Sequence, residues 1–329
     1  MATNQTPSPD CLLRLIQQAD EHYKQLPPGG KPARGRPLLF DTKSFFLLSV
    51  CAVVLRCFKG AELERLILRD ASLRHALGFA RTPHRKTIAR RLARLLPDAE
   101  RQVKELGREI LAALTNDETA VVSAIDGRMY AAAGALWHKQ DREADRIPSG
   151  LRNVDRESRW FKSGYRGWVQ GYRLVMQGLV FPQPVPLFAT WTMNNVGEAT
   201  TVKTALAENR LPVTSVLLGD ETFGGQPLTT AYTRAGGFLL TPKQLSEKRR
   251  SWKDDLFSYR KETIELLFQR VLQAADLKAC PSKGLCCNGA FVLVSVWLYQ
   301  LIFWCNYRQG TAAADVKEQI ELARWRIHL

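Results

Sequence analysis

The sequence lacks the motifs of several common enzyme classes, and each absence excludes a kind of chemistry. It has no Gly-x4-Gly-Lys phosphate loop and no serine or cysteine elbow, so nucleotide hydrolysis and acyl transfer have no support. Its seven cysteines are odd in number and repeat no metal-binding spacing, which favours reduced thiols over a zinc site. No basic, apolar and cleavage-site pattern opens the chain, so we expect no secretory signal and a cytoplasmic protein.

Long hydrophobic runs are also scarce. The apolar run 290–305 is shorter than the roughly 20 residues that span a bilayer, and it contains Gln300. We therefore expect a buried helix there and no membrane partner.

Positive charge is what the sequence has in excess. Its 329 residues include 47 Lys and Arg against 32 Asp and Glu, which gives a formal net charge of +15. This balance favours a polyanionic partner, above all nucleic acid. The alternative to a polyanionic partner is a basic surface that is exposed to solvent and binds none.

The chain is long enough for more than one domain, and its composition changes along its length. Residues 1–40 form a basic N-terminal segment in which Arg34 and Arg36 resemble the minor-groove arginines of an AT-hook, or belong to a plain linker. Residues 41–116 are typical of helices, the first capped by Asp41. We expect an all-helical DNA-binding domain there.

Within that helical region, one segment is strongly basic. Six basic residues and no acidic ones lie between positions 81 and 94, among them Arg85, Lys86 and Arg90. One face of the predicted helix is apolar and the other cationic, which suits a recognition helix against DNA phosphates. An ordinary amphipathic helix with an arginine-rich outer face explains the pattern equally well.

From residue 119 the pattern changes to alternating strands and helices. Strands are predicted over 119–126, 168–180, 186–193, 215–220 and 236–241. A helix over 197–209, a loop or short helix over 222–234 and a long helix from about 258 complete the order. This order predicts an α/β, RNase H-like mixed sheet flanked by helices over 117–310, followed by a tail helix over 311–329.

Three acidic residues occupy positions that such a fold can bring together. Asp126 follows a small, β-branched run and precedes Gly127, which predicts a strand ending in a turn. Asp220 ends the fourth predicted strand, and Glu265 lies on the last long helix. The neighbours of these residues, Glu221 and Glu262, remain alternatives. Converging carboxylates repel one another unless cations neutralise them. Their oxygens suit Mg²⁺ or Mn²⁺, and two such ions support phosphoryl transfer.

The same segments resemble the DDE transposases of bacterial insertion sequences. The likeness is carried by Asp126-Gly127, by Asp155 through Arg173, by Leu218-Gly-Asp220, and by Tyr259 through Phe268. It implies that Asp126, Asp220 and Glu265 are catalytic metal ligands in an RNase H-like core. It also implies cutting of transposon ends, joining to target DNA, double-stranded DNA as partner, a homodimer on DNA and a nucleoid-associated location.

Departures from the family keep two other functions open. Ser258, Lys261 and Leu272 stand where the signature around the glutamate has Tyr, Arg and Lys. The chain could therefore be a transposase-derived DNA-binding protein without catalysis, or another RNase H-like nuclease. Further DNA contacts are expected from basic residues beside Trp160 and Phe161 and near the last helix, namely Arg159, Lys162, Arg166, Arg249 and Lys261.

Overall fold

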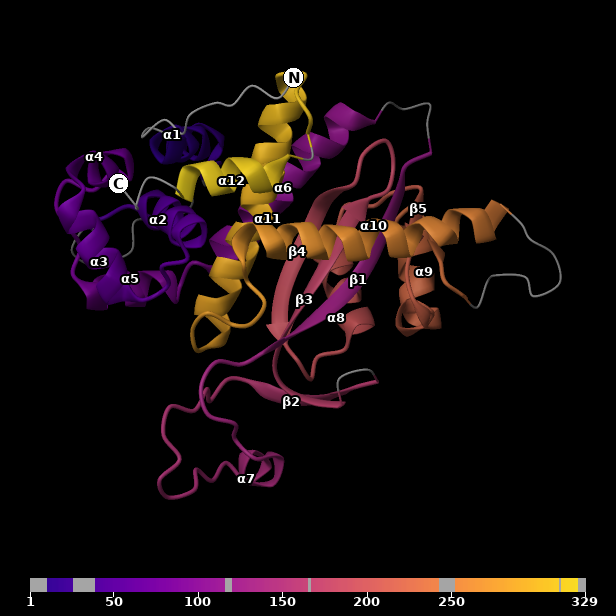
Figure 1. Cartoon of the computed structure of the whole chain (residues 1–329). Coiled ribbons are helices and arrows are strands. Elements are labelled where there is room, and N and C mark those ends of the chain that lie inside the picture. The colour runs from indigo at the N-terminus through magenta and orange to yellow at the C-terminus, as the bar shows by residue number, and fades with distance from the viewer. Residues whose placement is uncertain are drawn as a thin grey trace, which may run out of the picture.

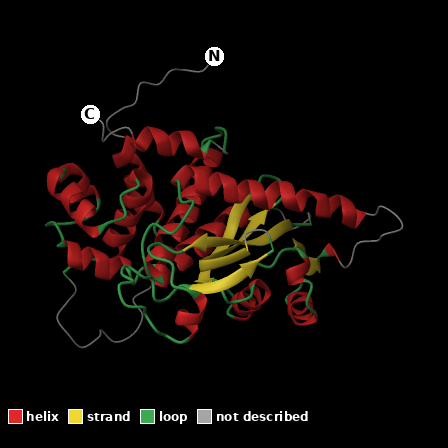
Figure 2. Ribbon diagram, turned by 60° about the horizontal axis from the view of Figure 1, so that its bottom comes forward, coloured by secondary structure: helices red, strands yellow, loops and turns green. Residues whose placement is uncertain are grey.

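A mixed sheet covered by helices on both faces is the centre of the molecule (Figures 1 and 2). The computed structural model describes residues 11–25, 39–115, 120–164, 167–242, 252–313 and 315–324. The strands are β1 (Val122–Ala131), β2 (Arg159–Ser163), β3 (Gly167–Leu179), β4 (Val185–Met193), β5 (Val216–Leu218) and β6 (Phe238–Leu240).

The sheet combines an antiparallel and a parallel half. Strand β3 pairs antiparallel with β1, β4 and β2, whereas β5 pairs parallel with both β1 and β6. The order along the sheet is β2-β3-β1-β5-β6, with β4 also on β3. Because β1 joins the two halves, residues on β1 and at the end of β5 come close to each other.

Both faces of the sheet are buried, so its central strands are apolar on both sides. Ala124, Leu218 and Leu240 belong to one hydrophobic cluster, whereas their neighbours Ile125, Leu217 and Leu239 belong to another. The alternation follows from the two-residue period of a strand. Residues at positions 124 and 218 therefore mark one face, and positions 125 and 217 mark the opposite face.

Different helices cover the two faces (Figures 1 and 2). Helices α6 (Leu96–Leu114) and α11 (Leu285–Arg308) pack on β4, and α10 (Trp252–Ala275) crosses β1, β3 and β5. Helices α8 (Glu198–Ala207) and α9 (Gln226–Arg234) contribute Val202, Ala205, Leu228 and Tyr232 to the cluster on the other face. The short helix η1 (Glu221–Phe223) links β5 to α9.

Five helices at the N-terminal end pack against the C-terminal ones. They are α1 (Cys11–His22), α2 (Thr42–Leu55), α3 (Gly60–Arg69), α4 (Ala71–Ala76) and α5 (Arg85–Leu92). The carboxylate of Asp41 accepts a hydrogen bond from the N–H of Lys43, as the predicted cap requires. One cluster joins Phe46 of α2, Trp297 of α11 and Val316 of the last helix, α12 (Val316–Arg324). The domain boundary near residue 116 stays a prediction, because this core is continuous across it.

The long apolar helix α11 is a core element. It is long and apolar enough to cross a membrane, but 83% of its most apolar window is buried inside the protein. Gln300 is fully buried and donates to the carbonyl oxygens of Val103 on α6 (3.1 Å) and Pro186 on β4 (2.9 Å). The polar residue within the predicted apolar helix therefore fixes α11 to its two neighbours.

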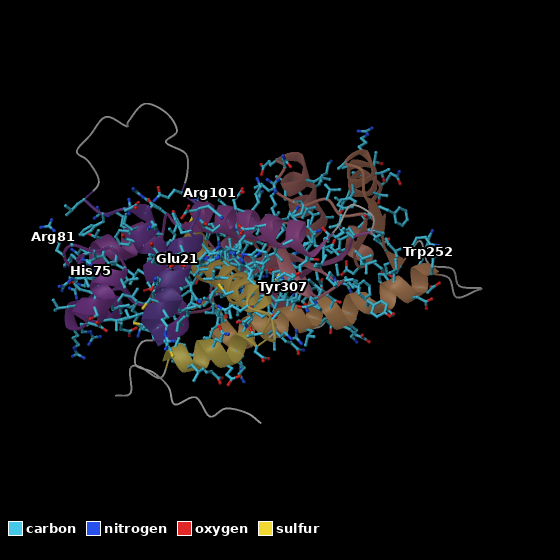
Figure 3. All side chains as sticks on the ribbon, turned by 90° about the horizontal axis from the view of Figure 1, so that it is seen from above. Glu21, His75, Arg81, Arg101, Trp252 and Tyr307 are labelled. Carbon is cyan, nitrogen blue, oxygen red and sulfur yellow. The ribbon has the colours of Figure 1, made fainter. Side chains whose placement is uncertain are left out.

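The observed elements differ from the predicted ones in several places. Strand β2, at the edge of the sheet on β3, and helix α7 (Lys139–Glu143) were not predicted; both lie at the bottom of Figure 1. Strand β1 continues to Ala131, and α10 begins at Trp252. In Figure 3, Trp252 lies at one end of the molecule, and Arg81, which precedes α5, lies at the other.

Candidate metal centre

Asp126 lies within β1, past the last residue of β1 that pairs with β5. The last parallel pair between these strands is Ala124 with Leu218, while β3 continues to pair with β1 as far as Ala131. Asp126 therefore shares a face with Ala124 and lies at the edge of the parallel half. The predicted turn at Gly127 is wrong, because β3 supplies a partner that holds this glycine in the strand.

Asp220 reaches the same edge from the neighbouring strand. It follows Leu218 by two residues, just as Asp126 follows Ala124, and adjacent strands lie about 4.8 Å apart. Its Oδ1 accepts hydrogen bonds from the backbone N–H (2.9 Å) and the hydroxyl (2.5 Å) of Thr222. The first turn of η1 thus fixes the orientation of the carboxylate.

Glu198 supplies a third carboxylate from the other face of the sheet. One carboxylate oxygen from each of Asp126, Glu198 and Asp220 lies within 4.8 Å of the others. The hydroxyl of Thr222 also lies 3.3 Å from Oε2 of Glu198, so Thr222 bridges two of the acids. We call these three residues the acidic cluster.

Gly127 is what allows Glu198 to approach β1. A Cβ atom at position 127 would lie 2.8 Å from Cγ of Glu198 and would overlap its carboxylate. The Asp-Gly pair in the sequence therefore has a steric function: the aspartate enters the cluster from one face of β1, and the missing side chain admits the glutamate from the other.

Glu265 lies outside the acidic cluster. It is exposed on α10, as is the alternative Glu262, and η1 likewise leaves the alternative Glu221 exposed. The residue of α10 that points to the cluster is Arg260. Five residues along a helix turn the side chain by about 140°, so Arg260 and Glu265 cannot face the same site. We expected Asp126, Asp220 and Glu265 to meet. The structure brings Asp126 and Asp220 together, but the third acid beside them is Glu198 and not Glu265.

Two arginines neutralise part of the negative charge. Nη2 of Arg260 lies 3.2 Å from Oδ2 of Asp126 and 4.0 Å from Oδ2 of Asp220. Nε of Arg173 lies 3.4 Å from Oε1 of Glu198. Three carboxylates and two guanidinium groups leave the cluster with a formal charge of −1 when every group is ionised.

Arg173 is the more firmly held of the two. Its side chain is 2% exposed, it donates to the carbonyl of Val196 (3.1 Å), and its guanidinium lies 4.5 Å from the ring centre of Phe161. Its Nε is buried without a hydrogen-bond partner among the described residues. Arg173 therefore links β2, β3 and the start of α8.

The electrostatic environment disfavours an uncompensated charge on the acids. Burial raises the pKa of Asp126 to about 6; the neighbouring Asp220 and Glu198 add to this shift, while Arg260 and the N–H of Gly127 oppose it. Burial also raises the pKa of Glu198, and Arg173 opposes that shift most strongly. The two arginines therefore do not fully compensate the acids, and a further cation would stabilise their ionised form.

A cavity of about 600 Å³ opens beside the acids. Its wall includes Arg128 on β1, Lys162 on β2 and Gly197 before α8. Lys162 is exposed. The cavity therefore combines three acids with basic side chains at its edge, which suits a phosphate-containing molecule.

The donor set fits a small, hard cation. The acidic cluster offers only oxygen ligands, which Mg²⁺ and Mn²⁺ prefer. The oxygens lie within 4.8 Å of one another, little more than twice a Mg–O length of about 2.1 Å. The guanidinium of Arg260 shows that a positive group is already accommodated between Asp126 and Asp220. Asp126, Glu198 and Asp220 are the residues that would hold such an ion.

The predicted DNA-contacting residues fall into three groups. The first group is exposed: Arg85, Lys86 and Arg90 on α5, Lys162 on β2 and Lys261 on α10. Arg159 is half-buried and donates to the carbonyls of Arg156, Glu157 and Ser158, so its guanidinium is occupied within its own loop. The remaining predicted residues lie outside the described part of the chain: Arg34, Arg36, Arg166 and Arg249.

Trp160 and Phe161, which lie beside the predicted DNA-contacting residues, have partners within the fold. Trp160 is half-buried and donates its indole N–H to the carbonyl of Trp137 (2.7 Å), and Phe161 lies against Arg173. Trp168 is 52% exposed, with the Lys139 ammonium 4.2 Å from its ring centre. Trp168 is therefore more accessible to a stacking base than Trp160 is.

Sequence reasoning missed Glu198 because an acid at a helix start has an ordinary explanation. Acidic residues are common in the first turn of a helix, where they interact favourably with its N-terminus; here the cap itself is Gly197, which makes no side-chain hydrogen bond. A signal was present in Gly127, whose vacant side-chain position requires a neighbour. Nothing in the sequence alone connects that glycine with position 198.

The chain has similarity to known proteins among solved structures. No protein-family model and no curated protein matches the sequence. Among solved structures, the chain is similar to a piggyBac transposase in a synaptic complex with hairpin DNA, determined by cryo-EM. The match has 11% sequence identity and a TM-score of 0.41, and it covers 99% of this chain and 83% of the other.

Proposed function

We propose that the chain is a divalent-metal-dependent DNA transposase that cuts transposon ends and joins them to target DNA. The observation that carries this proposal is the meeting of Asp126, Glu198 and Asp220, with oxygens within 4.8 Å of one another, beside a cavity with basic edges. Mg²⁺ or Mn²⁺, bound there as one or two ions, would activate a water or 3′-hydroxyl and stabilise the leaving oxygen.

The order of the strands supports an RNase H-like core. Strands β4, β3 and β1 are antiparallel neighbours, and β1, β5 and β6 are parallel neighbours, in the spatial order β4-β3-β1-β5-β6. This is the arrangement that the predicted succession of three strands, helix, strand, helix, strand and helix requires. In it, Asp126 and Asp220 come from the two strands where the antiparallel and parallel halves meet.

The chain's own residues position the acids and the phosphate. Arg173 orients Glu198, Thr222 orients Asp220, and β3 holds Asp126 in place by pairing with β1 on both sides of it. Lys162 lies at the edge of the cavity, where it would bind a DNA phosphate. The metal-ligand function expected for Glu265 passes to Glu198 in this proposal.

DNA is the proposed partner, over a surface larger than the cavity. The net charge of +15 and the exposed Arg85, Lys86 and Arg90 on α5 support binding to the phosphate backbone of double-stranded DNA. Pairing two transposon ends requires two active sites, so we propose a homodimer on DNA. We place the protein in the bacterial cytoplasm, associated with the nucleoid.

The test is a DNA cleavage and joining assay with the DNA that flanks the coding sequence. We expect the wild-type protein to nick that DNA with Mg²⁺ or Mn²⁺ and to join the released end to a target. Asp126→Asn and Asp220→Asn should bind DNA without nicking it. Nicking that proceeds equally with a chelator, or equally in both variants, would contradict the proposal. Nicking without joining would indicate another nuclease.

A DNA-binding protein without catalysis is the second candidate, and one observation favours it. Arg260 lies between Asp126 and Asp220, so these acids already have a cationic partner. If that contact is permanent, the acids stabilise the fold and do not bind metal. Salt-sensitive DNA binding with no Mn²⁺ binding and no nicking at any protein concentration would identify this function.

A further inference from the structure

Arg260 lies between two acids of the cluster that would also bind a metal ion. Its Nη2 lies 3.2 Å from Asp126 and 4.0 Å from Asp220, and its side chain is only 12% exposed. The same two acids carry carboxylate oxygens within 4.8 Å of Glu198. A guanidinium and a divalent cation cannot both sit between the same oxygens.

The two arginines of the cluster are held in different ways. Arg173 is anchored from several directions, by the carbonyl of Val196, the ring of Phe161 and Glu198. For Arg260, both ion pairs go to the acidic cluster, and its Nε is buried without a hydrogen-bond partner among the described residues. Withdrawal of the acids therefore removes the contacts that hold Arg260, whereas Arg173 would stay.

The side chain of Arg173 lines the same cavity and is 98% buried. Its Nε makes no hydrogen bond among the described residues, but it lies 3.4 Å from Oε1 of Glu198 and forms an ion pair with it. Arg173 therefore compensates Glu198, and Arg260 compensates Asp126 and Asp220. A metal ion at the two aspartates would have to replace the charge of Arg260.

We propose that Arg260 is the resident cation of the acidic cluster and competes with the divalent metal for it. In the metal-free protein it keeps Asp126 and Asp220 close together. When metal binds, Arg260 leaves the carboxylates and presents its planar fork of donors to a DNA phosphate at the same rim. Arg260 therefore lowers the metal affinity of the free protein and couples metal loading to DNA binding. This inference rests on the proposed metal site.

The test measures Mn²⁺ affinity of the DNA-free protein by titration calorimetry or by electron paramagnetic resonance of free Mn²⁺. Arg260→Met retains most of the aliphatic stem and removes the charge, and Arg260→Gln retains polarity. Both should bind Mn²⁺ at least about tenfold more tightly than wild type, because a like charge about 4 Å from the site has been removed. Lys203→Gln makes the same charge change on the exposed side of α8 and should leave the affinity unchanged.

The same titrations separate two kinds of failure. Equal or weaker Mn²⁺ binding in both Arg260 variants, with binding lost in Asp126→Asn, would overturn the competition while leaving the metal site intact. No Mn²⁺ binding to wild type or to either variant would overturn the proposed function itself.

Folding of the variants is checked by circular dichroism. If both Arg260 variants are unfolded without metal, Mn²⁺ should restore the folded spectrum, because it replaces the missing cation. Failure of Mn²⁺ to restore that spectrum would overturn the proposal. A further readout is DNA affinity with Mn²⁺ present, which should fall in Arg260→Met and stay at the wild-type level in Lys203→Gln.

Discussion

Two groups of acidic residues in this protein differ in the groups that compensate their negative charge. Asp155 is 2% exposed and accepts hydrogen bonds from the hydroxyl of Tyr172 (2.8 Å) and from the N–H groups of Glu157 (3.2 Å) and Gly284 (3.0 Å). Glu157 accepts from the N–H of Leu285. The donors to these two acids are neutral N–H and hydroxyl groups, and those of Gly284 and Leu285 belong to the start of α11.

The acidic cluster has the opposite arrangement. Its three carboxylates lie within 4.8 Å of one another and depend on two arginines and Thr222 for compensation. Burial and mutual repulsion raise the pKa of Asp126 to about 6. An acid whose described partners are all neutral donors belongs to the fold, whereas acids that lie against one another and against arginines require cations to balance their charge. This difference is the reason that we assign a structural function to the first group and propose a metal site at the second.

The largest expected effect separates Glu198 from Glu265. Glu198→Gln should lower metal-dependent DNA cleavage by about a thousandfold or more, since loss of a metal ligand removes several kcal/mol of transition-state stabilisation. Glu265→Gln is the matched control and should stay within a few-fold of wild type. Measured nicking rates that show the reverse order would return Glu265 to the site and remove Glu198 from it.

The next effect comes from the steric function of Gly127. Gly127→Ala should displace Glu198 and weaken Mn²⁺ binding by about 10–100-fold, the range typical when the support of a metal ligand is lost. Gly225→Ala is the control, because an added Cβ there would meet only Cδ of Pro227 at 3.9 Å. Calorimetric titration of both variants measures the difference. Unchanged affinity in Gly127→Ala would mean that Glu198 is not a ligand.

The acids at the start of α11 should affect stability and not metal binding. Asp155→Asn replaces an acceptor oxygen by an NH₂ group opposite buried donors, which should lower the free energy of unfolding by about 1–3 kcal/mol. Glu157→Gln, at an exposed position, should have a smaller effect. Urea unfolding gives both values. A loss of Mn²⁺ affinity in folded Asp155→Asn would break the distinction between the two groups of acids.

The smallest effect is a dependence of metal binding on pH. With a pKa of about 6 in the metal-free protein, Asp126 is ionised above that pH and protonated below it. Metal competes with this proton, so affinity falls as pH decreases: by about twofold at pH 6 and about tenfold at pH 5 relative to pH 8. Mn²⁺ titrations across this range measure the slope. A flat profile down to pH 5 would exclude Asp126 as a ligand with this pKa.

Much of the fold could be predicted because strands and helices carry their periodicity in the sequence. The five predicted strands and the buried helix over 290–305 correspond to β1, β3, β4, β5, β6 and α11. The end of β1 could not be predicted, because Asp126-Gly127 is also typical of a turn and only the long partner β3 keeps it extended. The short strand β2 depends on its pairing with β3 in the same way.

The site could be predicted only in part, for a geometric reason. Asp126 and Asp220 follow paired strand residues at equal distances, so their proximity follows from strand order. The third group depends on the rotation of a long helix about its axis, and a shift of one residue turns a side chain by about 100°. That rotation directs Arg260 to the acids and leaves Glu265 exposed. Glu198 comes from a helix on the opposite face of the sheet, which no local pattern connects with β1.

The most direct measurement is an anomalous-scattering map of crystals soaked with Mn²⁺. The account predicts a Mn²⁺ peak bonded to Asp126, Glu198 and Asp220, with the Arg260 guanidinium moved away from the two aspartates. Crystals at saturating Mn²⁺ that show Arg260 still between Asp126 and Asp220, with no Mn²⁺ at these acids or with Mn²⁺ bound at Glu265 instead, would contradict it.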